Sequence, residues 1–207
     1  MTDSPAAYIV DDDASMRALI GATLQSVGIE PVFFASADEF ATFKIPDRPA
    51  CILLDLQMPG QSGLELLERH FESTASCPVI VVTAHASVQV AVKSMKLGAV
   101  DFLEKPIDRP ALLAKVQAAI EKDRQRRAAS VETQEITRRL NTLSPREKEL
   151  LWTVIEGKST KMIADQLGIS ARTVDHHRAN LMQKMQAANV ADLVRMAVAA
   201  NFKPPRV

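Results

Sequence analysis

Short apolar runs alternate with stretches of helical periodicity in the first part of the chain. The apolar runs are Tyr8–Val10, Val32–Phe34, Ile52–Leu54, Val79–Val82 and Phe102–Leu103. The helical stretches are Ala14–Ser26, Ser36–Phe43, Gly63–Phe71, Ser87–Leu97 and a stretch that starts at Asp108. The run that ends at Asp55 predicts a strand that is buried on both faces. Such alternation is typical of a parallel sheet with helices on both sides.

Polar side chains follow several of these runs where the predicted strand ends. Pro59-Gly60, for example, marks a turn soon after the third run, so that strand ends near Asp55. Open α/β sheets bind ligands at the carboxyl ends of their strands. We therefore expect a functional site at this edge of the sheet, formed by Asp11, Asp12, Asp55, Thr83 and Lys105.

The chemistry of this set favours phosphoryl transfer. Several carboxylates at one edge repel one another unless a divalent cation lies between them. Mg²⁺ would bridge the carboxylates and a phosphoryl oxygen, while an ammonium group and a hydroxyl bind the other oxygens. Asp55 would then be the nucleophile and form an acyl phosphate. We interpret Asp13 as a helix cap, with a metal ligand as the alternative, because the helix begins at Ala14.

The last part of the chain is predicted to consist of helices only. Ser144-Pro145-Arg146-Glu147 has the residue types of a helix start. Two further helices, Ser159–Leu167 and Ala171–Met185, are joined by the tight turn Gly168-Ile169-Ser170. Two helices joined by a short glycine-containing turn indicate a helix-turn-helix unit, whose second helix enters the major groove of DNA.

The helical phase of Ala171–Met185 separates a buried face from an outward face. Val174, Leu181 and Met185 repeat with the period of a core stripe. Arginines on the outward face suit phosphates or guanine, asparagine suits adenine, and lysines suit phosphates. Asp175 would accept from cytosine or orient a neighbouring side chain. The predicted DNA contacts are Lys161, Arg172, Thr173, Asp175, His176, Arg178, Asn180 and Lys184.

The segment between these two parts contains neither glycine nor proline from Ala111 to Ser144, which predicts a helix. Glu121–Ser130 is almost wholly polar, and we interpret it as a solvated helix face. Asp123 and Arg127 interrupt an apolar seam, so a partly solvated helix is favoured over a stable coiled coil. The predicted domains are residues 1–122, a helical linker at residues 123–143, and residues 144–207.

Charge and composition refine this division. Residues 1–122 hold 10 Lys/Arg against 16 Asp/Glu, whereas residues 123–207 hold 15 against 9. A basic second part favours nucleic acid as its partner. No apolar run is long enough to cross a bilayer, and the amino terminus lacks the features of a signal peptide. We therefore predict a cytoplasmic protein without a membrane partner, whose Cys51 and Cys77 are reduced, buried thiols.

Four motifs of the first part resemble the receiver domain of bacterial two-component response regulators. They are Val10-Asp11-Asp12, Asp55 with Met58-Pro59, Thr83-Ala84 and Glu104-Lys105-Pro106. The resemblance implies a doubly wound, flavodoxin-like, five-stranded parallel sheet in the order 2-1-3-4-5. It implies that Asp55 is the phosphoacceptor, that Thr83 and Lys105 contact the phosphoryl group, and that the Lys105–Pro106 bond is cis. Phe102 would be the switch aromatic, with a packing role as the alternative. The implied Mg²⁺ ligands are Asp12, Asp55 and the main-chain carbonyl of Gln57, with Asp11 in the same pocket.

Motifs of the last part are similar to the four-helix LuxR-type DNA-binding domain. They are Leu143-Ser144-Pro145-Arg146-Glu147, Ile163-Ala164 with Leu167-Gly168-Ile169-Ser170, and Arg172-Thr173-Val174 with His177-Arg178-Ala179-Asn180. The whole chain thereby resembles the FixJ branch of response regulators. This implies a separate all-α domain, in which the last helix, Val190–Ala200, helps two DNA-bound copies to pair or simply packs in the core.

These resemblances imply a transcription regulator rather than an enzyme. A sensor histidine kinase would phosphorylate Asp55, and phosphorylation would favour a homodimer that binds promoter DNA, with RNA polymerase as a further candidate partner. One alternative is a receiver that acts as a phosphorylation-independent dimerisation module. A second alternative, an aspartyl-phosphate phosphatase, usually needs a carboxylate two residues after the nucleophile, where this chain has Gln57.

Overall fold

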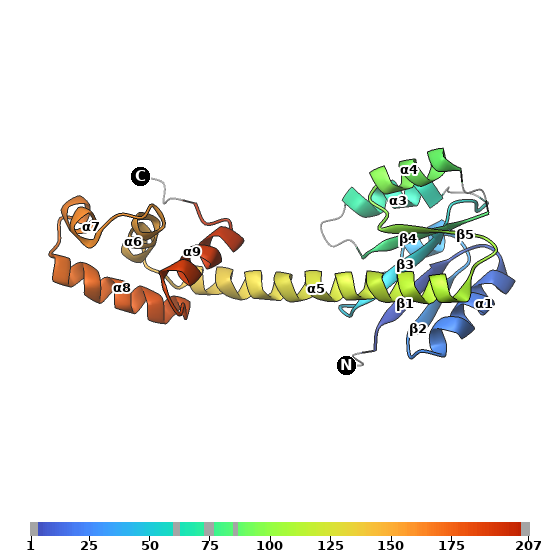
Figure 1. Ribbon diagram of the computed structural model, residues 1–207, viewed down its shortest axis with the longest axis horizontal. Coiled ribbons are helices and arrows are strands. Elements are labelled where there is room, and N and C mark those ends of the chain that lie inside the picture. Colours follow the sequence, from blue (N-terminus) through green and yellow to red (C-terminus); the bar gives the residue numbers. More distant parts are fainter. Residues whose placement is uncertain (1–3, 60–62, 73–76, 85–86, 204–207) are drawn as a thin grey trace. The chain divides into compact units, whose positions relative to one another are not determined.

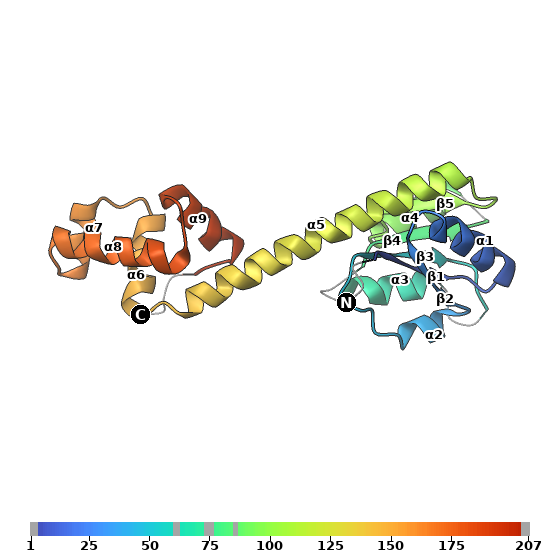
Figure 2. The same cartoon turned by 90° about the horizontal axis from the view of Figure 1, so that it is seen from below.

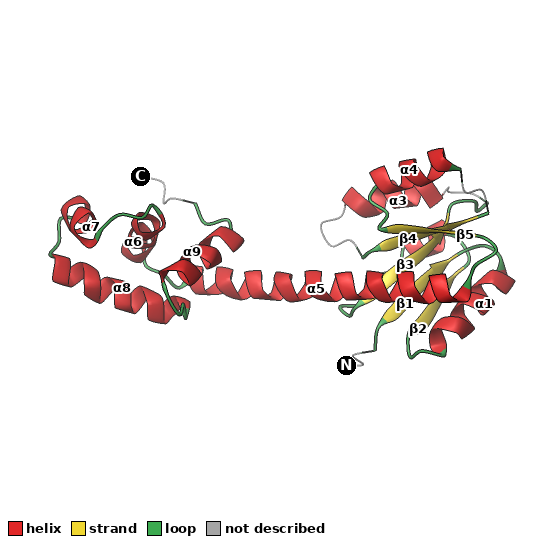
Figure 3. Cartoon of the chain, in the orientation of Figure 1, coloured by secondary structure: helices red, strands yellow, loops and turns green. Residues whose placement is uncertain are grey.

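The computed structural model describes residues 4–59, 63–72, 77–84 and 87–203. The chain divides into two compact units, Met1–Arg127 and Ala128–Val207. Figure 3 shows that the strands all belong to the first unit, whereas the second consists of helices and loops. Among the described residues, no helix combines the length and the apolar character that a membrane span requires.

A parallel sheet of five strands, in the order β2-β1-β3-β4-β5, forms the centre of the first unit (Figure 1). The strands are β1 (Ala6–Val10), β2 (Glu30–Phe34), β3 (Ala50–Asp55), β4 (Val79–Thr83) and β5 (Asp101–Glu104). Every residue of β1, β3 and β4 is buried, because helices cover both faces of these strands. The predicted fold class and strand order are thus confirmed.

Helices cover the two faces of this sheet in separate layers (Figure 2). Ile20 and Leu24 of α1 (Ala14–Gln25) pack with Leu112 and Val116 of α5 (Arg109–Asn141) on one face. On the other face, the core includes residues of α2 (Ala37–Ala41), α3 (Gly63–Glu72) and α4 (Val88–Lys96), among them Phe40, Leu67 and Val90. Cys51 and Cys77 are buried and form no disulfide with each other, as predicted.

The second unit contains α6 (Pro145–Ile155), α7 (Thr160–Leu167), α8 (Ala171–Met185) and α9 (Val190–Ala199). Ser144 caps α6 and forms a capping box with Glu147, as its sequence predicts. Gly168 ends α7 with a φ of 64°, a left-handed conformation that glycine adopts without steric strain. The turn between α7 and α8 is therefore as short as a helix-turn-helix unit requires.

The helix α5 is continuous over 33 residues, which confirms the helical prediction as far as Asn141. The interpretation of Glu121–Ser130 as a solvated face was wrong at Asp123, which has no exposed surface. Its carboxylate accepts from the main-chain N–H of Ala50 at 3.0 Å and from Arg126 and Arg127. A buried strand start needs an acceptor for its N–H group, and Asp123 supplies it.

The apolar residues at the end of the predicted linker belong to the second unit. Ile136, Leu140 and Leu143 are buried in the core that α6, α7, α8 and α9 share. The predicted linker, residues 123–143, is therefore divided between the two units, because its first residues pack on the sheet and its last ones pack on the helices.

Candidate functional site

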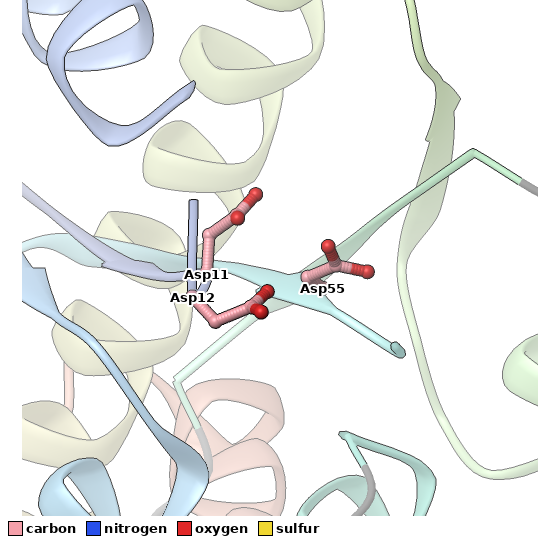
Figure 4. Close-up of side chains that lie close together, drawn as sticks. All are labelled: Asp11, Asp12 and Asp55. Carbon is pink, nitrogen blue, oxygen red and sulfur yellow. The ribbon is translucent and has the colours of Figure 1, made fainter. Parts of the chain in front are cut away.

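Three carboxylates converge at the carboxyl end of the sheet (Figure 4). Val10 of β1 is in register with Leu54 of β3, so the residues that follow, Asp11 and Asp55, lie next to one another. Oxygen atoms of Asp11, Asp12 and Asp55 lie within 4.8 Å of one another. Asp11 and Asp55 are buried, whereas Asp12 is exposed. The arrangement is a set of hard oxygen donors of the kind that Mg²⁺ prefers.

Lys105 joins two of these carboxylates. Its Nζ atom donates to Asp11 Oδ2 at 2.8 Å and to Asp55 Oδ2 at 2.5 Å. The Lys105–Pro106 peptide bond is cis, as predicted. Burial lowers the pKa of Lys105, but its hydrogen bonds to Asp11 and Asp55 outweigh this and leave the pKa raised. Burial also raises the pKa of Asp11, and the hydrogen bond from Lys105 offsets this only in part. A charged lysine thus offsets repulsion inside the acidic pocket.

Thr83 and Phe102 lie on the neighbouring strands β4 and β5. Thr83 is 1% exposed at the end of β4, in register with Glu104, the residue before Lys105. Phe102 is partly buried against the core on the α2–α4 face of the sheet. The main-chain N–H of Gln57 donates to Asp55 Oδ1 at 2.9 Å, which places the Gln57 main chain beside the pocket. The sheet register therefore brings Asp55, Thr83 and the residue before Lys105 to one edge of the sheet.

Asp13 stands apart from the carboxylate group, as the cap interpretation predicted. Its side chain accepts from the main-chain N–H groups of Ser15 and Met16 at the start of α1. Its own main-chain N–H donates to Asp11 Oδ1 at 2.9 Å. Asp13 therefore shapes the loop that carries Asp11.

Sequence reasoning missed two residues that support the pocket. Arg17 of α1 donates from Nη1 to the main-chain carbonyl of Asp11 at 2.6 Å. Gly63 lies so close to the end of β3 that an added Cβ atom would be 2.1 Å from the carbonyl oxygen of Asp55. A glycine at the start of the helix after Asp55 was the only sequence feature that pointed to this close approach.

The second site is the outward face of α8. Val174, Leu181 and Met185 are buried, as the helical phase predicts. The predicted DNA contacts lie outside this stripe. Lys161, Arg172, Asp175, His176 and Lys184 are exposed, and Thr173, Arg178 and Asn180 are partly buried.

Several of these side chains already have partners within the unit. Arg178 donates to Thr160 Oγ1 at 3.1 Å, which joins α8 to α7. Lys184 forms an ion pair of 2.7 Å with Glu147 of the α6 capping box, a contact that sequence reasoning missed. The hydrogen bond from Lys184 lowers the pKa of Glu147. Lys184 would have to leave this pair, or share it, to bind a DNA phosphate.

Two family models cover most of the chain. Residues 7–117 match the response regulator receiver domain, and residues 141–197 match the bacterial regulatory proteins of the luxR family. The transcriptional regulatory protein FixJ of Azorhizobium caulinodans is 41% identical over 204 residues, which cover 99% of this chain and 97% of that protein. The chain belongs to the FixJ-type two-component response regulators. FixJ of Bradyrhizobium diazoefficiens is 39% identical, with 98% of each protein covered.

Solved structures of response regulators agree with this regulator's fold. The response regulator StyR is 35% identical with a TM-score of 0.81, covering 94% of this chain and 98% of that one. Full-length FixJ from B. japonicum is 36% identical with a TM-score of 0.55, covering 98% and 100%. This FixJ-type protein is thus a phosphorylation-dependent, DNA-binding transcription regulator, and the alternative of a phosphorylation-independent dimerisation module is not favoured.

Proposed function

We propose that Asp55 accepts a phosphoryl group from a phosphohistidine of a sensor histidine kinase. A carboxylate oxygen of Asp55 attacks phosphorus, the phosphorus–nitrogen bond breaks, and the imidazole leaves and takes up a proton. The observation that carries this proposal is the ion-pair bridge from Lys105 to Asp11 and Asp55, at 2.8 and 2.5 Å, among carboxylates that lie within 4.8 Å of one another. Lys105 and the Thr83 hydroxyl then bind phosphoryl oxygens as charge develops on them.

Asp12, Asp55 and the main-chain carbonyl of Gln57, with Asp11 behind them, would hold Mg²⁺ in this pocket. The donor set fits, because every side-chain oxygen in it is a carboxylate and the three carboxylates lie within reach of one ion. When bound, the ion would neutralise charge on the phosphoryl oxygens. Arg17, through the main-chain carbonyl of Asp11, and the main-chain N–H of Asp13, through the Asp11 carboxylate, would keep Asp11 in place.

The proposed output is dimerisation and binding to promoter DNA in the cytoplasm. Phosphorylation would reposition Thr83 and Phe102, favour a homodimer, and present two α8 helices to two half-sites. RNA polymerase is a further proposed partner. We propose residues 1–122 as the receiver, residues 123–143 as the helical linker and residues 144–207 as the DNA-binding domain. The proposed DNA contacts are Lys161, Arg172, Thr173, Asp175, His176, Arg178, Asn180 and Lys184.

Asp12→Asn tests whether the pocket binds the Mg²⁺ that phosphorylation requires. We expect the Mg²⁺ concentration that gives half-maximal uptake of ³²P from labelled acetyl phosphate to rise about tenfold or more, because losing even an indirect partner of a bound metal costs that much. Asp13→Asn is the matched control, since asparagine also caps helices. Its Mg²⁺ concentration for half-maximal uptake should equal that of the wild type. Uptake by the wild type that is equally fast in excess EDTA would contradict the proposed site.

A further inference from the structure

The last turns of α5 are built into the DNA-binding unit. Ile136 and Leu140 are 2% and 5% exposed, and they share one apolar core with Leu181 and Met185 of α8. A helix that shares a core with α8 in this way is in a position to influence how α8 is held.

Arg139 lies on the same part of α5 and contacts the end of α8 directly. Its Nη1 atom donates to the main-chain carbonyl of Met185, the last residue of α8, at 3.0 Å. The last carbonyl groups of a helix lack partners inside the helix, and the helix dipole favours a positive charge beside them. Arg139 therefore acts as a C-terminal cap that is supplied by another helix.

Glu135, one turn earlier on α5, holds the guanidinium group of Arg139. Its Oε1 atom accepts from Arg139 Nε at 2.9 Å, and its carboxylate also accepts two hydrogen bonds from Arg138. Hydrogen bonds from Arg138 and then Arg139 lower the pKa of Glu135 to about 2, so the carboxylate stays charged at neutral pH. The side chain of Arg139 is only 20% exposed, whereas that of Arg138 is 70% exposed.

Arg139 caps the carboxyl-terminal end of α8, whereas the proposed DNA contacts of α8 begin near its amino-terminal end. Arg172 is 13 residues from Met185, which corresponds to about 20 Å along a helix. A tilt of about 5° at the capped end would displace the far end by about 2 Å over that length. That displacement exceeds what a side chain in hydrogen-bond contact with a base edge tolerates.

We propose that Arg139 is a positioning residue for DNA recognition, which fixes the angle of α8 by holding its last carbonyl group. The inference rests on the proposal that α8 contacts DNA. Its effect is on selectivity between DNA sequences rather than on general attraction to DNA, because Arg139 touches α8 and not the outward face. The linker helix thereby sets the geometry of the recognition helix within the same unit.

Arg139→Met in the full chain is the test, with Arg138→Met as the matched control. Both variants lose one positive charge and one partner of Glu135, but among the described contacts only Arg139 reaches α8. The probes are a duplex that the wild type selects from a random pool and a scrambled duplex of the same composition, at one salt concentration. We expect Arg139→Met to reduce the affinity ratio of the two duplexes about three- to tenfold, and Arg138→Met to leave it unchanged.

Hydrogen exchange supplies a readout that does not depend on DNA. The amides from Lys184 to Ala187 should exchange faster in Arg139→Met than in Arg138→Met. If Arg139→Met does not fold, Arg139→Lys and Arg138→Lys replace the pair, because lysine has a single nitrogen in place of the separate Nε and Nη1 atoms with which Arg139 reaches Glu135 and the Met185 carbonyl. Equal ratios and equal exchange in either pair would overturn the proposal. Failure of the wild type to select any duplex would instead overturn the DNA-binding function of α8 itself.

Discussion

Asp55→Asn should reduce the uptake of phosphoryl label from acetyl phosphate by more than about a thousandfold relative to the wild type. Asparagine keeps the shape of the side chain but has no nucleophilic carboxylate, so no acyl phosphate forms. The effect is expected to be this large because removing a group that forms a covalent intermediate removes the reaction path itself. Lys105 and the other carboxylates remain in place and cannot substitute for the missing oxygen.

The reaction of the labelled wild type with hydroxylamine identifies the bond that holds the label. An acyl phosphate reacts with hydroxylamine, which would release the label and leave a hydroxamate on Asp55 that peptide mapping locates. Label that survives hydroxylamine, or that Asp55→Asn still takes up at the wild-type rate, would rule out Asp55 as the phosphoacceptor.

Asp123→Ala should destabilise the first unit by about 3–5 kcal/mol. The carboxylate has no exposed surface, and its removal leaves the N–H of Ala50 without its acceptor and takes one of two acidic partners from Arg127, which keeps Asp47. Leaving a buried N–H without its acceptor costs about 1–3 kcal/mol, and each lost hydrogen bond to a charged group costs about 1.5–3 kcal/mol. Glu121→Ala on the same helix is the control, because the pair of Glu121 and Arg124 is exposed and should contribute less than about 1 kcal/mol.

The chain offers a separate optical probe for each unit. Its single tyrosine, Tyr8, lies in β1 and its single tryptophan, Trp152, lies in α6. In urea unfolding, the transition seen by tyrosine absorbance should move to lower urea in Asp123→Ala, while the transition seen by tryptophan fluorescence stays in place. A tyrosine transition that matches that of Glu121→Ala would show that the buried carboxylate contributes little.

The receiver site could be predicted because each functional residue follows a run of apolar residues. Apolar runs of that length fix where a strand ends, and parallel register then brings Asp11, Asp55, Thr83 and Lys105 to one edge. The same reasoning assigned the buried face of α8, since Val174, Leu181 and Met185 follow the helical period. Patterns of this kind depend on local sequence alone, which is why sequence reasoning recovers them.

Contacts made by charged residues on helices could not be predicted in the same way. Asp123, Arg139 and Lys184 all stand in stretches whose composition is that of a solvated helix. Their partners are the N–H of Ala50, the carbonyl of Met185 and a capping-box carboxylate, which become neighbours only in the folded chain. Gly63 is a similar case, because the main chain of Asp55 lies too close to this position for a Cβ atom.

The most direct test of the account measures DNA affinity before and after phosphorylation. The dissociation constant of the duplex selected by the wild type should fall when the wild type is treated with acetyl phosphate and Mg²⁺, and it should not change for Asp55→Asn under the same treatment. Equal affinity of treated and untreated wild type, with label present on Asp55, would contradict phosphorylation control of DNA binding.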